Sequence, residues 1–356
     1  MIADRLTVTQ ENPIATPSGS RRGSVTVVCP FYNEEAIIRT AAEVMVAKLS
    51  ECFDDWELIL VDDGSTDGSL AEILAFRDSL EAGRVAVISY QPNRGRGHAL
   101  RQGIDAARGD IIVTTEVDLS WGENIVPQLF DALAADETAH FVIASPNLSG
   151  VGYIEVPISR RLISRLGNKL IGLFFSGGIT MHTGMTRAYR SEIIKPLQFK
   201  SDGKEFHLEV LLKLLTLGFN AIEIPAAISW EIRNKTARRQ RPGAHVLNRR
   251  MLGTISSHLL FIALARPMAY FGVISAIAVL GGILFALAAI WNLLTGGVSA
   301  FFAVISMLLF LFGVLFTGFA VVFTLLRELS RDNWLRAYPN HRELLTKVTR
   351  HDSVDR

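Results

Sequence analysis

Charged residues are scarce in this sequence, and the scarcity is concentrated in one tract. They make up 20% of the 356 residues, against about 25% in a typical soluble domain. Between Pro267 and Leu326 there is no Asp, Glu, Lys or Arg. A purely soluble protein is therefore excluded. A multi-span transporter is excluded as well, because most of the chain is too polar to lie in lipid.

The sequence also lacks a charge excess, a cysteine framework and an apolar N-terminal segment. Its 36 basic residues are nearly balanced by 35 acidic ones, so no nucleic-acid partner is expected. Two cysteines are too few for a disulfide framework and suit a reducing compartment. Residues 1–23 are polar, so they predict a disordered tail rather than a secretory signal.

Two uncharged stretches, Met268–Leu294 and Phe301–Leu326, predict a pair of transmembrane helices. Each exceeds the roughly 20 residues that a helix needs to cross a bilayer core. The short segment Thr295–Ala300 between them predicts the turn of a hairpin. Lys and Arg are absent from this turn and frequent on both outer flanks, which predicts that both termini are cytoplasmic.

Residues 24–230 alternate short β-rich runs with helical stretches. Strands are expected at Val25–Cys29, Trp56–Val61, Val85–Tyr90, Ile111–Thr115 and Phe141–Ser145, and helices near 34–50, 67–82, 97–108 and 123–136. This alternation indicates βαβ units and a largely parallel sheet. Ligands bind at the carboxyl ends of the strands of such a sheet, so the residues just after each strand are the candidates for function.

The first two strands are followed by an aromatic ring and by carboxylates. Tyr32 offers a flat ring, and Glu34 offers an acceptor at the start of a helix, although a plain turn before an acidic helix start has the same composition. The adjacent carboxylates of Asp62 and Asp63 suit a base or a ribose. The alternative there is that Ser65 or Thr66 caps the next helix.

The third strand leads to glycines that alternate with arginines in Asn93–Leu100. Such a backbone can approach a diphosphate, and its arginines can neutralise it. An NAD loop is excluded, because its glycine motif would have to follow the first strand. After the fourth strand, Glu116 and Asp118 are two residues apart, so both can point to one hard cation such as Mg²⁺. Alternatively, Asp118 caps a helix and Glu116 faces solvent.

Taken in order, these four segments resemble the successive motifs of the family 2 glycosyltransferases of the GT-A fold. The matching segments are Pro30–Glu34, Val61–Asp67, Asn93–Ala99 and Glu116–Asp118, followed by Arg160–Ser164, Thr183–Arg190, Glu205–Lys213 and the stretch from Glu223 to Lys235. With the two spans, the chain resembles the bacterial relatives of dolichol-phosphate mannose synthase, the polyprenyl-phosphate glycosyltransferases.

The resemblance implies an α/β fold, with a Rossmann-like GT-A domain on a mostly parallel sheet followed by a two-helix transmembrane hairpin. The expected division is a tail (1–23), the glycosyltransferase domain (24–235), juxtamembrane helices (236–266), two transmembrane helices (267–326) and a cytoplasmic C-terminal tail (327–356). The glycines in the spans permit a homo-oligomer.

The resemblance also implies the site residues. The nucleotide sugar is expected on Pro30, Tyr32, Glu34, Asp62, Asp63, Arg94, Gly95, Glu116 and Asp118. A bound Mg²⁺ or Mn²⁺ is expected on Glu116 and Asp118. Phosphates of the donor or of the lipid are expected on Arg161, Arg187, Arg233 and Lys235. The expected catalytic residues are Asp118, Arg187 and His182.

The implied activity is an inverting transfer of a sugar from a nucleotide sugar to polyprenyl (undecaprenyl) phosphate, at the cytoplasmic face of a bacterial inner membrane. A lipid phosphate is already anionic near neutral pH, so the harder task is to stabilise the leaving nucleoside diphosphate. One alternative acceptor is a lipid hydroxyl, which needs a general base such as Glu209 or His182. Another alternative is a catalytically silent membrane scaffold. A processive synthase is disfavoured, because no Gln-x-x-Arg-Trp run precedes Arg266.

Three segments depart from the family pattern. The acidic pair begins with Glu116 where relatives carry Asp, and Ala144–Asn147 lacks an arginine that relatives often have near the fifth strand. The segment Met181–Arg187 lacks the family's acidic residue, and His182 stands beside that position. These changes affect the substrate and acceptor more than the fold.

Overall fold

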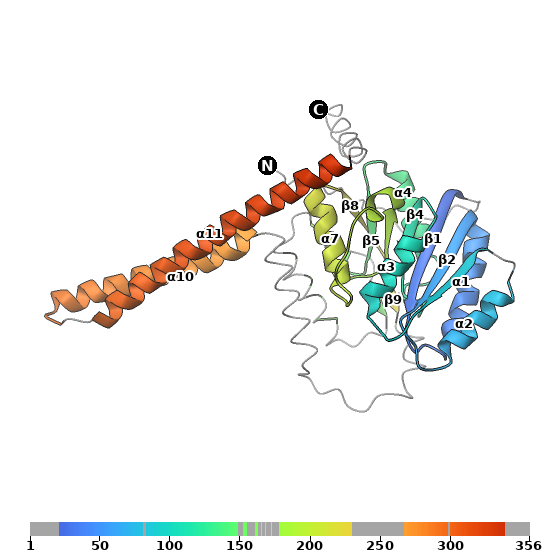
Figure 1. Ribbon diagram of the computed structural model, residues 1–356, viewed down its shortest axis with the longest axis horizontal. Coiled ribbons are helices and arrows are strands. Elements are labelled where there is room, and N and C mark those ends of the chain that lie inside the picture. Colours follow the sequence, from blue (N-terminus) through green and yellow to red (C-terminus); the bar gives the residue numbers. More distant parts are fainter. Residues whose placement is uncertain are drawn as a thin grey trace. The chain divides into compact units, whose positions relative to one another are not determined.

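The computed structural model describes residues 21–80, 83–148, 152–154, 178–229, 267–297 and 300–338, together with single positions between 161 and 172. The chain divides into two compact units. One comprises Met1–Ile255 with Glu343–Arg356, and the other comprises Ser256–Arg342. The first unit holds a β-sheet with its helices, and the second holds two long helices (Figure 1).

A seven-stranded sheet organises the first unit, in the order β3-β2-β1-β4-β7-β5-β8. Its strands are β1 (Arg21–Phe31), β2 (Phe53–Asp62), β3 (Val85–Ser89), β4 (Ile111–Thr114), β5 (Phe141–Ser145), β7 (Arg187–Arg190) and β8 (Ala221–Pro225). β7 is antiparallel to both of its neighbours, and the other pairs are parallel. Two short strands, β6 (Tyr153–Ile154) and β9 (Ile228–Ser229), pair separately. The expected mostly parallel α/β sheet is therefore confirmed.

Helices cover both faces of this sheet. They are α1 (Ile38–Cys52), α2 (Ser69–Asp78), α3 (Arg96–Ala106), α4 (Ile125–Ala135), α6 (Ser191–Ile194) and α7 (Phe206–Leu217). Because side chains alternate along a strand, Val25, Val27 and Cys29 of β1 pack in one core with α1 and α4. The opposite face of β1 meets α3, where a Cβ atom on Gly103 would lie 2.2 Å from Val28.

The five strands and four helices expected from the sequence between residues 24 and 145 are all present, with shifted ends. α1 begins at Ile38 rather than near 34, because a turn at residues 35–37 precedes it. β7 was not anticipated. Its sequence, Arg-Ala-Tyr-Arg, is short and has a charged residue at each end, so it shows no apolar run.

The second unit is a hairpin of α10 (Pro267–Leu294) and α11 (Ala300–Ala337), which lie side by side (Figure 1). Both helices are long and apolar enough to cross a membrane. The Ser275 hydroxyl donates to the Gly313 carbonyl at 2.8 Å, and the Ser306 hydroxyl donates to the Gly282 carbonyl at 2.9 Å. These bonds and the two glycines bring the backbones close together, as is typical of transmembrane helix pairs.

The candidate transmembrane hairpin thus agrees with the expected fold class. α11 continues beyond Leu326 to Ala337, so no break in the helix marks the expected start of the C-terminal tail at 327. Charged residues end the apolar stretch without ending the helix, because Arg, Glu and Leu all favour helical conformation. The expected N-terminal tail up to residue 20, the whole juxtamembrane segment 236–266, Arg233 and Lys235 lie outside the described residues.

Candidate functional site

The loops that follow β1 and β2 are joined into one unit by hydrogen bonds. Asn33 has a positive φ of 55°, its N–H donates to the Ser65 hydroxyl at 3.0 Å, and its side-chain oxygen accepts from the Thr66 N–H at 2.8 Å. The Glu35 carboxylate accepts from the Gly68 N–H at 3.1 Å. The second loop therefore uses Ser65 and Thr66 to hold the first loop.

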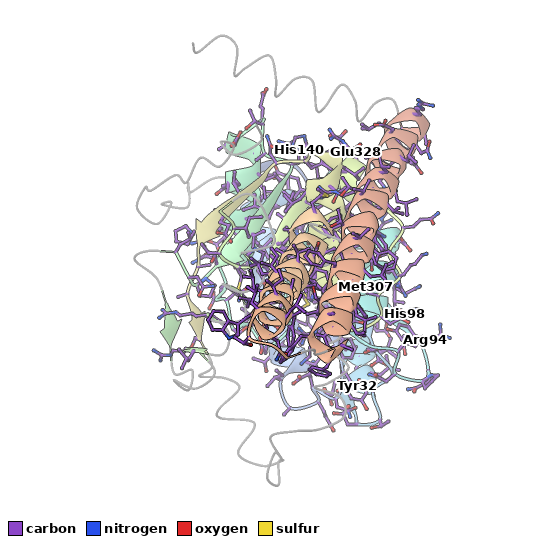
Figure 2. The ribbon with its side chains drawn as sticks, turned by 90° about the vertical axis from the view of Figure 1, so that its left-hand side faces the viewer. Tyr32, Arg94, His98, His140, Met307 and Glu328 are labelled. Atoms are coloured by element: carbon purple, nitrogen blue, oxygen red, sulfur yellow. The ribbon has the colours of Figure 1, made fainter. Side chains whose placement is uncertain are left out.

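Tyr32 is the exposed side chain of the first loop, at 44% of its full exposure. Figure 2 shows Tyr32 and Arg94 at the same end of the domain, the end at which the parallel strands finish. Pro30 and Glu34 are half-buried. The Glu34 N–H donates to the Ser69 hydroxyl at 2.8 Å, and its carbonyl accepts from the first turn of α1. Tyr32 is thus the most accessible of the residues expected to contact a nucleotide in this loop.

The carboxylates of Asp62 and Asp63 are buried and engaged by protein donors. Asp62 accepts from the Ser65 N–H and from the Ser89 hydroxyl, each at 2.9 Å. The donors to the carboxylate of Asp63 are Tyr90 Oη (2.9 Å), Asn93 Nδ2 (2.9 Å), Arg94 N (3.0 Å) and Gly95 N (3.0 Å). Burial and the bond to Asp63 raise the pKa of Tyr90, which keeps its hydroxyl a donor. Asp63 therefore fixes the loop after β3.

The two glycines of that loop make room for another segment of the chain. Gly95 has a φ of +105°, and a Cβ atom there would lie 2.5 Å from the Asp202 carbonyl oxygen. A Cβ atom on Gly97 would lie 2.6 Å from the Ser201 carbonyl oxygen. The Asp202 carbonyl also accepts from Gly97 N at 2.7 Å and from His98 N at 3.2 Å. The contact of Gly95 with a diphosphate stays a prediction, and the structure places a chain segment near residue 202 beside these glycines.

The carboxylates of Glu116 and Asp118 are more exposed than those of Asp62 and Asp63. Glu116 Oε1 lies 3.4 Å from Arg96 Nη1, and Glu116 Oε2 accepts from the Ser120 hydroxyl at 3.1 Å. Asp118 Oδ1 accepts from Ser120 N at 3.0 Å. Both side chains are partly exposed. The alternative that Asp118 caps the next helix is wrong, because α4 begins only at Ile125.

This acidic pair fits a divalent cation that arrives with its own phosphate ligands. Carboxylate oxygens are hard donors, and Mg²⁺ is commonly held by one or two carboxylates together with substrate phosphates. Among the described residues, no group of three or more His, Cys, Asp or Glu side chains is placed to hold a metal. The pair therefore suits a cation that is completed by a substrate rather than a stand-alone metal centre.

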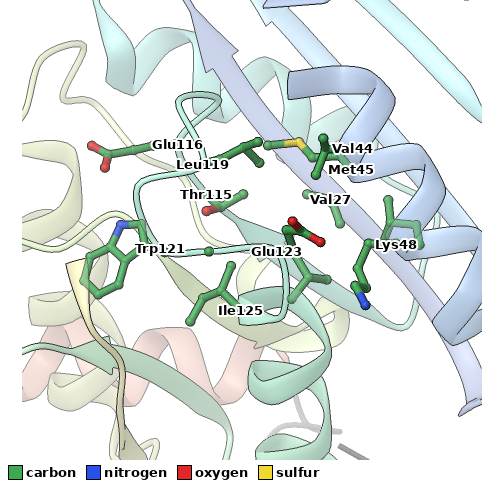
Figure 3. Close-up of a pocket in the computed structure, with 13 residues that line it drawn as sticks. Val27, Val44, Met45, Lys48, Thr115, Glu116, Leu119, Trp121, Glu123 and Ile125 are labelled. Atoms are coloured by element: carbon green, nitrogen blue, oxygen red, sulfur yellow. The ribbon is translucent and has the colours of Figure 1, made fainter. Parts of the chain in front are cut away.

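A cavity beside Glu116 has the wrong chemistry for phosphate. It contains about 400 Å³ of empty space, part of it open to solvent. Its lining is mainly apolar and comprises Val27, Val44, Met45, Lys48, Leu49, Thr115, Glu116, Leu119, Trp121, Gly122, Glu123, Ile125 and Val126 (Figure 3). In Figure 3 the Glu116 carboxylate points away from this lining. The acidic pair is thus directed away from the cavity.

Arg187, expected to contact phosphates, is fully buried in β7. Its Nη1 donates to the His207 carbonyl at 3.0 Å, and its Nη2 donates to the His182 carbonyl at 2.7 Å. The guanidinium therefore ties the segment around residue 182 and the first turn of α7 to the sheet. A contact of Arg187 with a phosphate stays a prediction, and in the structure its guanidinium donates to these two carbonyls.

The two candidates for a general base are not placed for that task. His182 is 1% exposed, and burial together with the nearby charge of Arg187 lowers its pKa to about 4. Burial alone would raise the pKa of Glu209, but bonds from Lys213, Ser201 and Lys200 outweigh it and lower that pKa. The Glu209 carboxylate accepts from Ser201 N at 2.8 Å and Lys213 Nζ at 2.6 Å. It therefore fixes a loop.

Arg161 is half-buried at a helical position, and its neighbours at 163 and 164 lie outside the described residues. Sequence reasoning missed three residues that organise the site, namely Arg96, Ser120 and Tyr90. Arg96 lies within the glycine-arginine motif, so the sequence could have identified it as a site residue. Ser120 and Tyr90 carried none, because their partners Glu116 and Asp63 are identified only by the fold.

Comparison with known families and proteins agrees with this arrangement. Residues 26–197 match the family model described as Glycosyl transferase family 2. The undecaprenyl-phosphate 4-deoxy-4-formamido-L-arabinose transferase of Edwardsiella ictaluri is 31% identical over 177 residues, which cover 49% of this chain and 51% of that protein. The dodecaprenyl-phosphate galacturonate synthase of Rhizobium johnstonii is 29% identical over 184 residues, covering 51% and 52%. The chain thus spans about half the length of these curated relatives.

Solved structures share the fold of the first unit. One is glucosyl-3-phosphoglycerate synthase from Mycobacterium tuberculosis in complex with Mn²⁺, UDP-glucose and phosphoglyceric acid. It has a TM-score of 0.52 and 21% identity, and the match covers 73% of this chain and 89% of that one. The same enzyme in complex with phosphoglyceric acid has a TM-score of 0.50 and 20% identity, covering 68% and 81%. These similarities support the GT-A-like fold of the sheet domain.

Proposed function

Because this chain carries a family 2 glycosyltransferase domain at residues 26–197, we propose that it transfers a sugar from a nucleotide sugar to a polyprenyl phosphate at a membrane. One observation carries this proposal. The Glu116–Asp118 pair lies at the carboxyl edge of the sheet, in the same chain as a candidate transmembrane hairpin. The relatives that this chain matches over about half of their length support it, because their names include undecaprenyl and dodecaprenyl phosphate.

The donor would bind across the loops at the carboxyl ends of β1 to β4. Tyr32 offers its exposed ring to the base, and Pro30 and Glu34 flank it. The buried carboxylates of Asp62 and Asp63 hold the loops around the nucleotide in place. Arg94 is exposed on the loop that Asp63 fixes, so its guanidinium is available to the donor phosphates.

Glu116 and Asp118 would hold Mg²⁺ or Mn²⁺ on the donor diphosphate. A bound divalent ion stabilises the negative charge that develops on a leaving diphosphate. Ser120 bonds to both carboxylates and sets their orientation. Arg96, which already contacts Glu116, would add a positive charge at the same place.

A lipid phosphate is a better acceptor for this site than a lipid hydroxyl. A hydroxyl needs a general base to remove its proton, but Glu209 is held by three donors and His182 is buried. A phosphate oxygen attacks without a base, opposite the leaving group, which inverts the anomeric configuration. Arg161, Arg233 and Lys235 are the proposed contacts to this acceptor, and the catalytic domain and both termini would lie in the cytoplasm.

The test is a thin-layer assay of the detergent-purified full chain with undecaprenyl phosphate and a panel of radiolabelled nucleotide sugars. A lipid product that needs Mn²⁺ and is cleaved by mild acid is expected. Label found only in an acid-stable glycolipid would overturn the phosphate acceptor. No product across the panel, together with no Mn²⁺-dependent nucleotide binding by calorimetry, would favour a silent membrane scaffold instead.

A further inference from the structure

Arg96 and Glu116 form the ion pair that links the start of α3 to the loop after β4. Nη1 of Arg96 lies 3.4 Å from Oε1 of Glu116, and the two side chains are 38% and 23% exposed. The other carboxylate oxygen of Glu116 accepts from the Ser120 hydroxyl. Arg96 therefore contacts the oxygen that Ser120 leaves open.

A long and partly exposed ion pair of this kind contributes little to stability, so it can exchange partners readily. A neighbouring arginine shows the contrast, since Arg101 pairs with Asp202 and also donates to two backbone carbonyls, those of Phe199 and Ser201. Arg96 has no such backbone anchors among the described residues. Its guanidinium is thus the more mobile of the two.

Three N–H groups at the start of α3 are already bonded within the protein. Gly95 N is bonded to Asp63, and Gly97 N and His98 N are bonded to the Asp202 carbonyl. A helix N-terminus usually binds phosphate through such N–H groups. Here the charged donor at the helix start is the side chain of Arg96.

We propose that Arg96 is a positioning residue that holds Glu116 while the donor is absent, and exchanges it for the donor diphosphate when the divalent cation arrives. The proposal rests on the proposed function, because it takes Glu116 as a ligand of that cation. In the exchange Glu116 loses a singly charged partner and gains a doubly charged one, and the negative diphosphate that arrives with the cation takes up the released guanidinium. The released guanidinium then meets the diphosphate, whose oxygens suit its fork of N–H donors.

Arg96 and a cation compete for Glu116 when no nucleotide is present, and they cooperate when one is. Removing Arg96 should therefore change the two affinities in opposite directions. Mn²⁺ binding alone should become about two- to five-fold tighter, which corresponds to the loss of a weak ion pair. UDP or GDP binding in the presence of Mn²⁺ should become at least about ten-fold weaker, because charge-assisted bonds are lost.

The experiment measures free Mn²⁺ by electron paramagnetic resonance, and UDP and GDP binding by calorimetry, on the full chain in detergent. The variants are Arg96→Gln, Arg96→Lys and Arg94→Gln. The last removes the same charge two residues away, and Arg94 has no ion pair with Glu116 among the described residues. Only Arg96→Gln should bind Mn²⁺ alone more tightly. Arg96→Lys keeps the charge but not the fork, so it should weaken nucleotide binding without tightening Mn²⁺ binding.

If Arg96→Gln bound Mn²⁺ alone no more tightly than the unaltered protein, the proposed exchange of Arg96 from Glu116 to the diphosphate would be overturned. The proposed function would still stand in that case, provided that the unaltered protein binds a nucleotide in a Mn²⁺-dependent way. Equal tightening by Arg94→Gln would also overturn the exchange, because the effect would then be general electrostatics. If the unaltered protein bound no Mn²⁺ with either nucleotide, the metal site of the proposed function would fail first, and the exchange with it. If circular dichroism shows that Arg96→Gln folds poorly, the test rests on Arg96→Lys. This variant must bind the nucleotide more weakly than the unaltered protein and bind Mn²⁺ alone equally well, or the proposal is overturned.

Discussion

Two loops at the same edge of the sheet carry pairs of carboxylates, and the two pairs are used differently. Asp62 and Asp63 are buried, and each accepts hydrogen bonds from backbone N–H groups and from side chains of neighbouring loops. Glu116 and Asp118 are partly exposed, and Ser120 donates to both, with Arg96 at a longer distance from Glu116. The degree of burial, rather than residue type, separates carboxylates that build a site from those that can take a ligand.

The largest expected effect comes from the ligand-binding pair. Asp118→Asn should lower kcat at least about 100-fold, a size typical of losing charge stabilisation at a reacting centre, with little change in Tm. Radiolabelled transfer and differential scanning fluorimetry measure the two quantities. Glu123→Gln is the matched control, because Glu123 is an exposed carboxylate in the same loop between β4 and α4. A large fall in Tm for Asp118→Asn would place this residue with the structural pair.

Arg187 is a buried cation that holds the fold together, as the buried carboxylates of Asp62 and Asp63 do. Arg187→Met should lower the free energy of unfolding by about 2 kcal/mol, because the carbonyls of His182 and His207 lose their buried donors. Chemical denaturation, followed by a spectroscopic signal of the sheet domain's tertiary structure, measures this change. The control is Arg39→Met, because Arg39 is an exposed arginine on α1. If Arg187 contacted the lipid phosphate instead, the KM for the lipid would rise while stability stayed unchanged.

Asp63→Asn tests the structural pair itself. An amide has one acceptor oxygen in place of two, so donors from Tyr90, Asn93 and Gly95 cannot all be satisfied. We expect a loss of about 1–2 kcal/mol in the free energy of unfolding. Asp78→Asn, at an exposed position at the end of α2, should be neutral. If Asp63→Asn were as stable as the unaltered protein but had lost its affinity for the nucleotide, Asp63 would be a ligand-binding residue.

The effect that is smallest near neutral pH is a pH dependence from buried His182. Its pKa falls from about 6.5 in an unfolded chain to about 4 in the folded protein, through burial and then through Arg187. Below pH of about 6.5 the unfolded chain takes up the proton first, so stability falls as the pH drops toward 4, by at most about 1.4 kcal/mol per pH unit for this group. His182→Gln should make the fall shallower in denaturant titrations at several pH values. An unchanged slope would show that His182 is not responsible.

The sequence allowed most of the fold to be predicted, for a physical reason. Strands such as Phe141–Ser145 are continuous apolar runs, since both of their faces are buried, and the two candidate spans are marked by the absence of charge over more than 20 residues each. β7 could not be predicted, because a buried strand with Arg187 at one end and Arg190 at the other resembles a surface turn. Its arginines donate to carbonyls of His182, His207, Ala139 and Leu133, which only the fold brings near.

The candidate site could be located from the sequence, but its internal division could not. Each of four residues lies in the loop after a strand, which correctly predicted that they lie at one edge of the sheet. They are Tyr32, Asp63, Arg94 and Glu116. Whether Asp63 faces a ligand depends on Tyr90 and on the loop after β3, which approach it across 27 to 32 residues of chain. The use of Gly95 and Gly97 depends likewise on Asp202, far along the sequence. Such distant partners leave no local pattern.

The most direct test of a metal-dependent transfer through Glu116 and Asp118 is the rate of sugar transfer to undecaprenyl phosphate after EDTA treatment and after addition of Mn²⁺ or Mg²⁺. The unaltered protein should lose transfer with EDTA and regain it with either ion, whereas Asp118→Asn should stay inactive in both conditions. Transfer that persists in EDTA, or equal transfer by Asp118→Asn, would contradict the assignment of this acidic pair.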